Sequence, residues 1–156
     1  MHIHRLEKIW LIIGISMLVI FLAVLGVGTF AMGVAPPGGH HHSIDPETVT
    51  EKEPFNNPGL RQIGENEYEA VMLAFAFGYS PEQMEVPVGA KVHFVVTSTD
   101  VVHGFAIPGT NVNMMAVPGE VNTISHTFNE PGEYLILCNE YCGAAHEMMM
   151  TTIIVR

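Results

Sequence analysis

The feature of this sequence that most limits how it can fold is an uncharged apolar run near the N-terminus. Residues 9–35 contain no Asp, Glu, Lys or Arg, and only Ser16 and Thr29 carry polar side chains. About 20 apolar residues span a bilayer as a helix, so these 27 residues are enough to cross one with some tilt. A cleaved signal peptide has a shorter apolar core, of about 7–15 residues. The run therefore predicts an uncleaved transmembrane helix over 9–35.

Charged residues on the two sides of this run predict its orientation. Arg5 and Lys8 precede it, and the next basic residue is Lys52. By the positive-inside rule, residues 1–8 form a cytoplasmic N-terminus, and the rest of this single-pass chain lies outside the cell (plasma) membrane. Beyond residue 35 the chain has four basic and fifteen acidic residues. That excess argues against nucleic acid as a partner, and it serves either a basic docking partner or solubility alone.

The remainder divides into a linker and one β domain. Residues 36–60 are rich in Pro, Gly and acidic residues and have no apolar period, which predicts a linker. Residues 61–156 contain short strand-like runs separated by the turns "PVGAK", "IPGTN", "VPGEV" and "EPGEY". The predicted strands cover residues 68–77, 84–88, 91–98, 122–128, 133–138 and 151–156. This pattern predicts an all-β domain, either an antiparallel β-sandwich or a Greek-key barrel.

The only two cysteines lie in "CNEYCGAAHEMM", residues 138–149, between two predicted strands. The spacing directs Cys138, Cys142, His146 and Met149 at one point, and three readings of it compete. A disulfide suits an oxidising compartment, but it closes a very short loop and leaves the histidine and methionine without a role. A structural zinc site could use two Cys and two His, without the thioether. Copper accepts thiolate, thioether and imidazole ligands.

Counting the donors favours copper, in the form of a pair of ions. The sequence offers two thiolates, two imidazoles, one thioether and a loop carbonyl. If both thiolates bridge, these donors fill two four-coordinate copper ions, and no mononuclear site uses all of them. Three histidines, His93, His103 and His126, remain candidates for the second imidazole on sequence spacing alone.

The cysteine motif resembles the Cu-A loop of cytochrome c oxidase subunit II, whose pattern is Cys-x-Glu/Gln-x-Cys-Gly-x-x-His-x-x-Met. Residues 97–143 and "FAFGYSPEQMEVPVGAKVHF" are similar to the same family. The single anchor resembles the B-type (ba-type) branch of haem-copper oxidases. This resemblance implies a cupredoxin-like Greek-key fold, and it implies six metal ligands: His103, Cys138, Glu140, Cys142, His146 and Met149.

In that family Cys138 and Cys142 would bridge two copper ions. His103 and Met149 would complete one ion, and His146 and the backbone carbonyl of Glu140 the other. In many oxidases a glutamate here also directs its carboxylate toward a magnesium ion at the subunit I interface, whereas some B-type relatives carry glutamine. The resemblance therefore leaves magnesium near Glu140 as an open question.

The function that the resemblance implies is electron transfer within an oxidoreductase, without oxygen chemistry on this chain. The copper pair would accept electrons from cytochrome c or a similar soluble donor and pass them to haem in subunit I, where oxygen is reduced to water. Phe75, Phe77 and Tyr79 stand where larger relatives have a tryptophan-rich run, so they form either an electron-accepting patch or part of a core strand. Membrane lipid is a further expected partner.

Three other functions compete with this one. A quinol oxidase subunit II lacks the copper ligands, and nitrous oxide reductase needs a propeller domain that 156 residues cannot hold. The alternative that remains open is a membrane-anchored copper-binding or delivery protein without an electron-transfer role.

Overall fold

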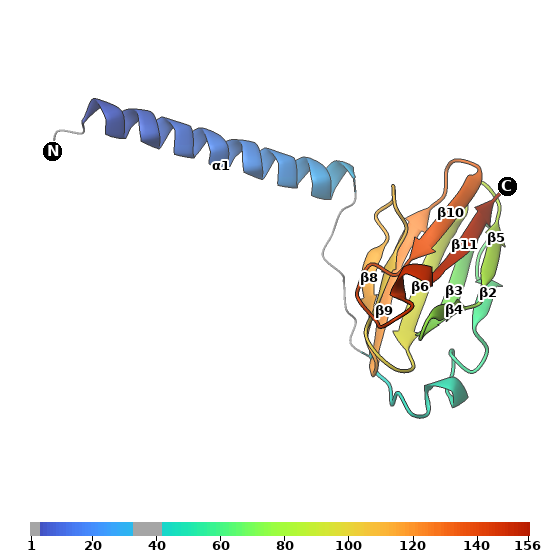
Figure 1. The fold of residues 1–156 in the computed structure, drawn as a ribbon. Helices are drawn as coiled ribbons and strands as arrows, with labels where there is room; N and C mark the ends of the chain where they lie inside the picture. Colours follow the sequence, from blue (N-terminus) through green and yellow to red (C-terminus); the bar gives the residue numbers. More distant parts are fainter. Residues whose placement is uncertain (1–3, 33–41) are drawn as a thin grey trace. The chain divides into compact units, whose positions relative to one another are not determined.

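The structure, a computed structural model, describes residues 4–32 and 42–156 (Figure 1). The chain divides into two units between residues 36 and 37, and each is described by itself. Parts of three predicted segments therefore lie outside the described residues: 1–3 of the N-terminus, 33–35 of the membrane span and 36–41 of the linker.

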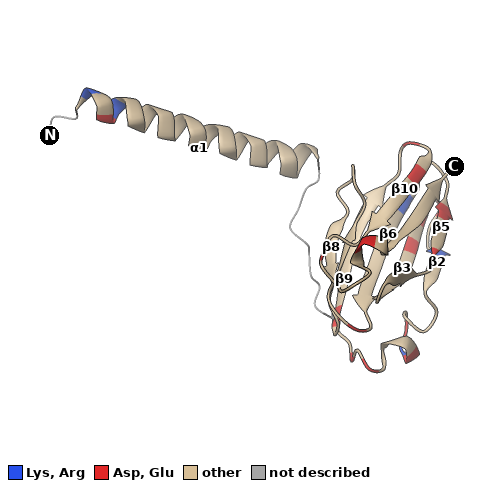
Figure 2. Cartoon of the chain, in the orientation of Figure 1, with Lys and Arg blue, Asp and Glu red and all other residues tan. Residues whose placement is uncertain are grey.

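The first unit contains one helix, α1, which covers Arg5–Ala31. Its N-terminus is closed by a capping box. The His4 side chain accepts a hydrogen bond from the amide of Leu6, and the Glu7 carboxylate accepts one from the amide of His4. The charged residues lie only at this end of the helix (Figure 2). Among the described residues, α1 alone is long and apolar enough to span a membrane.

The second unit is a sandwich of two β-sheets (Figure 1). One sheet has the order β1-β9-β6-β3-β2, with β4 paired to β3, and the other has the order β5-β11-β10-β7-β8. The strands of the first sheet are β1 (His42–Ser43), β2 (Gly59–Gln62), β3 (Glu67–Phe75), β4 (Gly78–Ser80), β6 (Lys91–Ser98) and β9 (Glu120–Thr127). Those of the second are β5 (Gln83–Val86), β7 (His103–Ala106), β8 (Asn113–Ala116), β10 (Gly132–Leu137) and β11 (Met150–Val155).

The strand directions differ in part from the antiparallel arrangement that the turns predict. β3 pairs with β6 in parallel, and β11 pairs with β5 in parallel. Between β3 and β6 the chain forms β4 and then crosses to the other sheet as β5, so it returns to the first sheet in its original direction. The predicted strand over 68–77 also stops at Phe75, because the chain turns there and pairs back as β4.

The core lies between the two sheets and follows the alternation in β6. Val92, Phe94 and Val96 are fully buried, whereas Lys91 is exposed. Phe94 also contacts Phe105 of β7, with ring centroids 5.4 Å apart. The aromatic packing therefore connects the central strand of one sheet to the strand that begins at His103.

Part of the region predicted as a linker packs on the outer face of the first sheet. Val49, in a short 3₁₀ helix over Val49–Glu51, and Phe55 are each only 1% exposed. They form a second apolar cluster with Val71 and Leu73 of β3. β3 is therefore buried on both faces, and residues 42–60 belong structurally to the β domain.

Candidate metal centre

The cysteine motif forms a loop whose two ends are held by neighbouring strands. At the end of β10, Leu137 pairs with Met150 of β11 on one side and with Ala106 of β7 on the other. The amide of Cys138 then donates to the carbonyl of Met149, 3.2 Å away. The start of the twelve-residue motif lies against the beginning of β7, where the amide of Gly104 donates to Sγ of Cys138.

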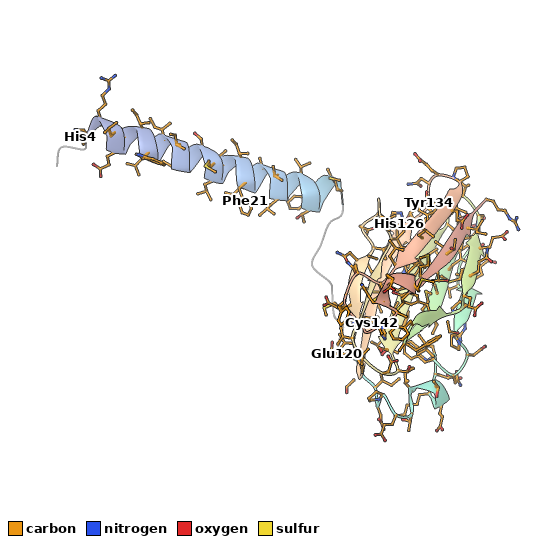
Figure 3. All side chains as sticks on the ribbon, viewed as in Figure 1. His4, Phe21, Glu120, His126, Tyr134 and Cys142 are labelled. Carbon is orange, nitrogen blue, oxygen red and sulfur yellow. The ribbon has the colours of Figure 1, made fainter. Side chains whose placement is uncertain are left out.

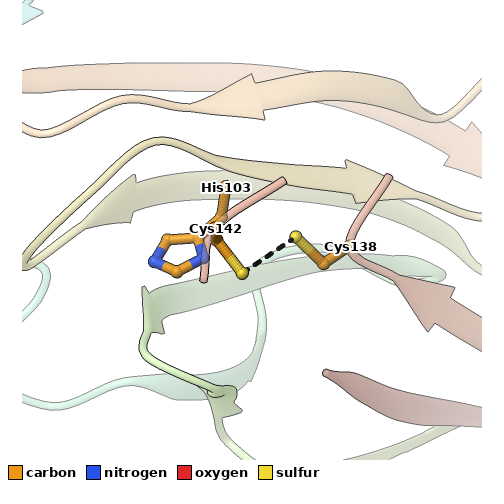
Figure 4. A group of neighbouring side chains, drawn as sticks. All are labelled: His103, Cys138 and Cys142. Atoms are coloured by element: carbon orange, nitrogen blue, oxygen red, sulfur yellow. Dashed lines mark hydrogen bonds between the residues drawn. The ribbon is translucent and has the colours of Figure 1, made fainter. Parts of the chain in front are cut away.

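Three metal-binding side chains meet under this loop (Figure 4). The ligand atoms of His103, Cys138 and Cys142 all lie within 4.8 Å of one another. The two sulfur atoms are 3.8 Å apart and both thiols are free, whereas a disulfide bond is about 2.05 Å long. Since a thiolate–metal bond is about 2.3 Å, both sulfurs can bind the same ion without moving far.

The ring of His103 is oriented by the carboxylate of Asp100. Nε2 of His103 lies 2.7 Å from Oδ1 of Asp100, and the histidine is fully buried. A carboxylate only accepts hydrogen bonds, so Nε2 carries the proton and Nδ1 presents a lone pair. Nδ1 is buried and has no hydrogen-bond partner among the described residues. This is the nitrogen that a metal ion would bind, and the carboxylate behind the ring is the usual support for such a ligand.

The electrostatics of Asp100 suit this role. Partial burial raises the pKa of its carboxyl, but hydrogen bonds from His103 and from the amides of Val101 and Ala76 outweigh that effect and hold the pKa below its usual value. The carboxylate is therefore ionised at neutral pH and keeps His103 in the metal-binding tautomer. Sequence reasoning missed Asp100, although its place three residues before the histidine was a signal that could have identified it.

The remaining predicted ligands also contact the two sulfurs. The carbonyl oxygen of Glu140 lies 3.1 Å from Sγ of Cys138, while the Glu140 side chain is exposed. Sγ of Cys142 lies 3.5 Å from Nδ1 of His146 and 3.7 Å from Sδ of Met149, which is buried. His146 is not a member of the tight group of His103 and the two cysteines, and it contacts that group, as Met149 does, through Sγ of Cys142.

The two other candidate histidines lie away from this group. Nδ1 of His93 is 2.8 Å from the Ser125 hydroxyl, between β6 and β9. Nδ1 of His126 is 2.6 Å from Oδ1 of Asn111, and desolvation by burial lowers the pKa of His126. Neither belongs to the group that could hold a metal, so the structure favours His103 as the second imidazole.

The pKa of the Cys142 thiol is raised to about 11, first by desolvation and then by the neighbouring Cys138. Two adjacent thiols disfavour the charge that either would acquire on losing its proton. A cation placed between them removes this penalty, since thiolates are the form that binds metal. The donor set and its electrostatics therefore fit a thiolate-bound metal.

The predicted apolar patch is only partly at the surface. Phe75 and Phe77 are 40% and 38% exposed, but Tyr79 is 2% exposed and belongs to the core. Tyr79 is the middle residue of β4, where the alternation of the strand turns its side chain inward against Phe105. An exposed patch containing Tyr79 is therefore wrong, whereas the two phenylalanines line a cleft of about 490 Å³ beside Met150.

Comparison with known proteins identifies the family. Residues 73–156 match the periplasmic domain of cytochrome C oxidase subunit II. Over 154 residues the chain is 46% identical to cytochrome c oxidase subunit 2 of Thermus thermophilus, and the match covers 96% of this chain and 91% of that protein. The chain belongs to the cytochrome c oxidase subunit II family.

Solved structures agree with this membership. A chain of a heme-copper terminal oxidase dimer is 33% identical to this subunit II, with a TM-score of 0.79 and coverage of 97% of this chain and 100% of that one. The periplasmic domain of subunit II of the cytochrome oxidase of Bradyrhizobium japonicum has the same fold, with a TM-score of 0.54 at 22% identity. That match covers 61% of this chain and 88% of the other.

Several predictions from the sequence are thereby confirmed. The β domain has the cupredoxin-like fold, and the chain is subunit II of a haem-copper oxidase, an oxidoreductase. As a subunit II it has a subunit I as its partner, and α1 makes it a single-pass membrane protein. The family and the group of His103, Cys138 and Cys142 together indicate a copper-binding domain.

Proposed function

We propose that this subunit II holds a dinuclear copper centre of the Cu-A type and is the subunit through which the oxidase accepts electrons. The observation that carries the proposal is the convergence of two free thiols and His103 within 4.8 Å, with the Nδ1 lone pair of His103 unpartnered among the described residues. When bound, the copper pair supplies one-electron oxidation and reduction. A soluble donor such as cytochrome c would provide the electrons, and haem in subunit I would receive them for the reduction of oxygen to water.

The ligands in this proposal are the six that the sequence predicts. Cys138 and Cys142 would contribute thiolates shared by both ions. His103 and Met149 would complete one ion, and His146 and the carbonyl of Glu140 would complete the other. The contacts of Glu140, His146 and Met149 with the sulfurs support this set.

The protein's own contribution is to hold these donors in place and to keep water away from them. Asp100 fixes the tautomer of His103, and the strand pairs at both ends of the loop hold the two sulfurs at their spacing. His103 and Met149 are buried and Cys138 is only 9% exposed. Donors that are already placed move little when the charge of the centre changes, which lowers the reorganisation cost of electron transfer.

The donor is proposed to dock beside Phe75 and Phe77. Phe77 lies directly against the loop over residues 138–149, which we call the copper loop. A Cβ built on Gly143 of this loop would be 2.9 Å from Cε1 of the Phe77 ring. Gly143 also has a φ of +136°, which side-chain-bearing residues rarely adopt. The cleft lined by the two phenylalanines thus adjoins the residue that follows Cys142, and a donor seated there would be close to the centre.

Four further assignments complete the proposal. Arg5 and Lys8 support a cytoplasmic N-terminus with the copper domain outside, on the periplasmic side of the plasma membrane. The surface of α1 would then contact membrane lipid. The exposed carboxylate of Glu140 is available to a magnesium ion at the subunit I interface. The finding of one candidate membrane span among the described residues supports the ba-type branch.

Copper loading of the full chain in detergent tests the proposal. We expect two copper ions per chain, a purple product and a seven-line electron paramagnetic resonance signal, because one unpaired electron is shared by two equivalent nuclei. One zinc per chain, or a blue product with one copper, would refute the dinuclear assignment. A copper store or delivery protein would instead bind copper(I) and give no such signal.

A variant tests whether the proposed centre is required for electron transfer. Cys142→Ser removes one shared sulfur while leaving Cys138 and His103 in place. We expect the assembled oxidase to lose turnover with cytochrome c in this variant. Ser43→Ala, at an exposed position in β1, is the matched control and should keep full turnover. Normal turnover in Cys142→Ser would show that the proposed centre is not on the path of electrons.

A further inference from the structure

Tyr79 reaches the copper site from the core through its hydroxyl group. The side chain is 2% exposed, and its ring meets the edge of Phe105, with centroids 5.8 Å apart. The O–H donates a hydrogen bond of 2.5 Å to the carbonyl of Gly104, the residue after His103 in β7. Neither alternative that the sequence offers for Tyr79, an electron-accepting patch or a core strand, accounts for this buried hydrogen bond.

Gly104 in turn contacts the first cysteine. Its amide donates to Sγ of Cys138 at 3.3 Å. A Cβ built on Gly104 would lie 2.0 Å from Oδ1 and 2.5 Å from the amide nitrogen of Asn139, and 2.8 Å from the amide nitrogen of Glu140. The backbone of this glycine therefore lies flat against the backbone of the copper loop. Its N–H faces the sulfur, and its C=O is held by Tyr79.

We propose that Tyr79 is a positioning residue that tunes the copper centre by holding Gly104 so that its N–H hydrogen-bonds the Cys138 sulfur. The proposal rests on the proposed function, because it concerns the reduction potential of the centre that Cys138 would bridge. The chain of contacts runs from the Tyr79 hydroxyl to the Gly104 carbonyl, and from the Gly104 amide to the sulfur.

The direction of the effect follows from charge. An N–H group that points at a thiolate stabilises negative charge on the sulfur, and a reduced centre carries more of that charge than an oxidised one. Hydrogen bonds around the cysteine sulfur are a known means of tuning copper sites. A well-aligned Gly104 amide therefore raises the reduction potential, and loosening it lowers the potential.

The chemistry of the hydroxyl suits a permanent donor. Burial, and the proximity of Cys138, raise the pKa of Tyr79 above its usual value. The hydroxyl is therefore protonated at neutral pH and can act as a hydrogen-bond donor. A phenylalanine fits the same space and keeps the edge contact with Phe105, so Tyr79→Phe removes only the hydroxyl, with its hydrogen bond to Gly104 and its interaction with the Cys138 side chain.

The test compares Tyr79→Phe with Tyr134→Phe in the copper-loaded full chain. Tyr134 also donates to a main-chain carbonyl, that of Glu130 at 3.0 Å, and lies apart from Cys142 (Figure 3). Both variants lose one tyrosine–carbonyl hydrogen bond, so a purely structural effect would appear in both. Redox titration monitored by the sulfur-to-copper absorption bands, with copper hyperfine splitting as a second readout, measures the centre itself.

In Tyr79→Phe we expect the equilibrium constant for reduction to fall by a factor of about 3–10, with shifted absorption bands and two copper ions still bound. Tyr134→Phe should match the parent in potential and spectrum. If Tyr79→Phe shares the parent's potential and bands, the positioning role is wrong, even though the centre exists. A parent chain that fails to bind two copper ions would instead refute the proposed function, so the two failures are distinguishable.

Discussion

At the scale of single residues, the protonation of Cys142 governs both metal uptake and the stability of the metal-free protein. Desolvation and the adjacent Cys138 raise its pKa to about 11, above the usual value for a thiol of about 8.5. Between these two pH values the folded state holds a proton that the unfolded chain has lost. The contribution of the raised Cys142 pKa to the free energy of unfolding is therefore fully present below about pH 8.5. It is lost as the pH rises through about 11.

The metal-free chain is accordingly expected to lose thermal stability from about pH 8.5 to 11, and to do so more steeply than Cys142→Ser, which lacks the titrating thiol. Differential scanning calorimetry at about pH 8, 9, 10 and 11 measures both chains. The difference between the two slopes isolates Cys142 from the lysines and tyrosines that also titrate in this range. Parallel slopes for the two chains would contradict the raised pKa.

The sequence identifies the site residues that carry the metal-binding chemistry better than those that position them. Cysteine and histidine at the motif spacing mark a metal site by residue type alone, and the family resemblance adds His103. Asp100 and Gly104 act through one hydrogen bond each, and such residue types are common in loops for other reasons. Sequence reasoning leaves Tyr79 either in an exposed patch or in a core strand, because the turn between β3 and β4, which reverses the strand, leaves little trace in the local pattern.

At the scale of elements, the segment before β2 makes a larger contribution than its composition suggests. Phe55 is 1% exposed and packs with Val49 over Val71 and Leu73. Two apolar residues are easily overlooked among the surrounding prolines and acidic residues. Because they are separated by six positions and do not follow the period of a helix or a strand, no periodicity test detects them.

We expect Phe55→Ala to lower the free energy of unfolding of the β domain by about 3–5 kcal/mol, the usual cost of emptying a buried aromatic site. Ile63→Ala, at a side chain that is 55% exposed, is the control and should change it by less than about 1 kcal/mol. Urea denaturation followed by tyrosine fluorescence measures both variants. Equal and small effects would mean that 42–60 behaves as a solvated linker.

The strands show what local patterns can and cannot provide. The alternation in β6 predicts its buried face correctly, with Val92, Phe94 and Val96 turned inward. The sequence does not predict β7 and β8, because "HGFA" and "NMMA" are too short for a period to be recognised. The parallel pairing of β3 with β6 depends on a crossover between sheets, which leaves no local signal.

At the scale of the whole molecule, charge sets how partners approach. The chain has a formal net charge of −10, and acidic residues are distributed over many strands and loops of the β domain (Figure 2). An acidic surface attracts a basic donor over about one Debye length, which shrinks from about 30 Å at 0.01 M salt to about 8 Å at 0.15 M. Electrostatic steering should therefore respond strongly to salt.

We predict that the second-order rate constant for reduction of the assembled oxidase by a basic cytochrome c falls about tenfold between about 0.01 and 0.15 M salt. Stopped-flow absorption at the copper bands measures this rate. An uncharged small reductant serves as the control, and its rate constant should not change with the salt concentration. A flat response with the protein donor would mean that Phe75 and Phe77, rather than charge, carry the docking.

The spacing of the two sulfurs has a consequence for how such a subunit must mature. In the metal-free protein the thiols are 3.8 Å apart, so a small approach brings them within reach of an S–S bond of about 2.05 Å. On the outer side of the membrane, where we place this domain, thiols are prone to oxidation. A cystine formed there would consume both thiols of the candidate metal site at once. Assembly of the proposed copper centre would then require either delivery of copper before oxidation or a reductant that reopens the pair.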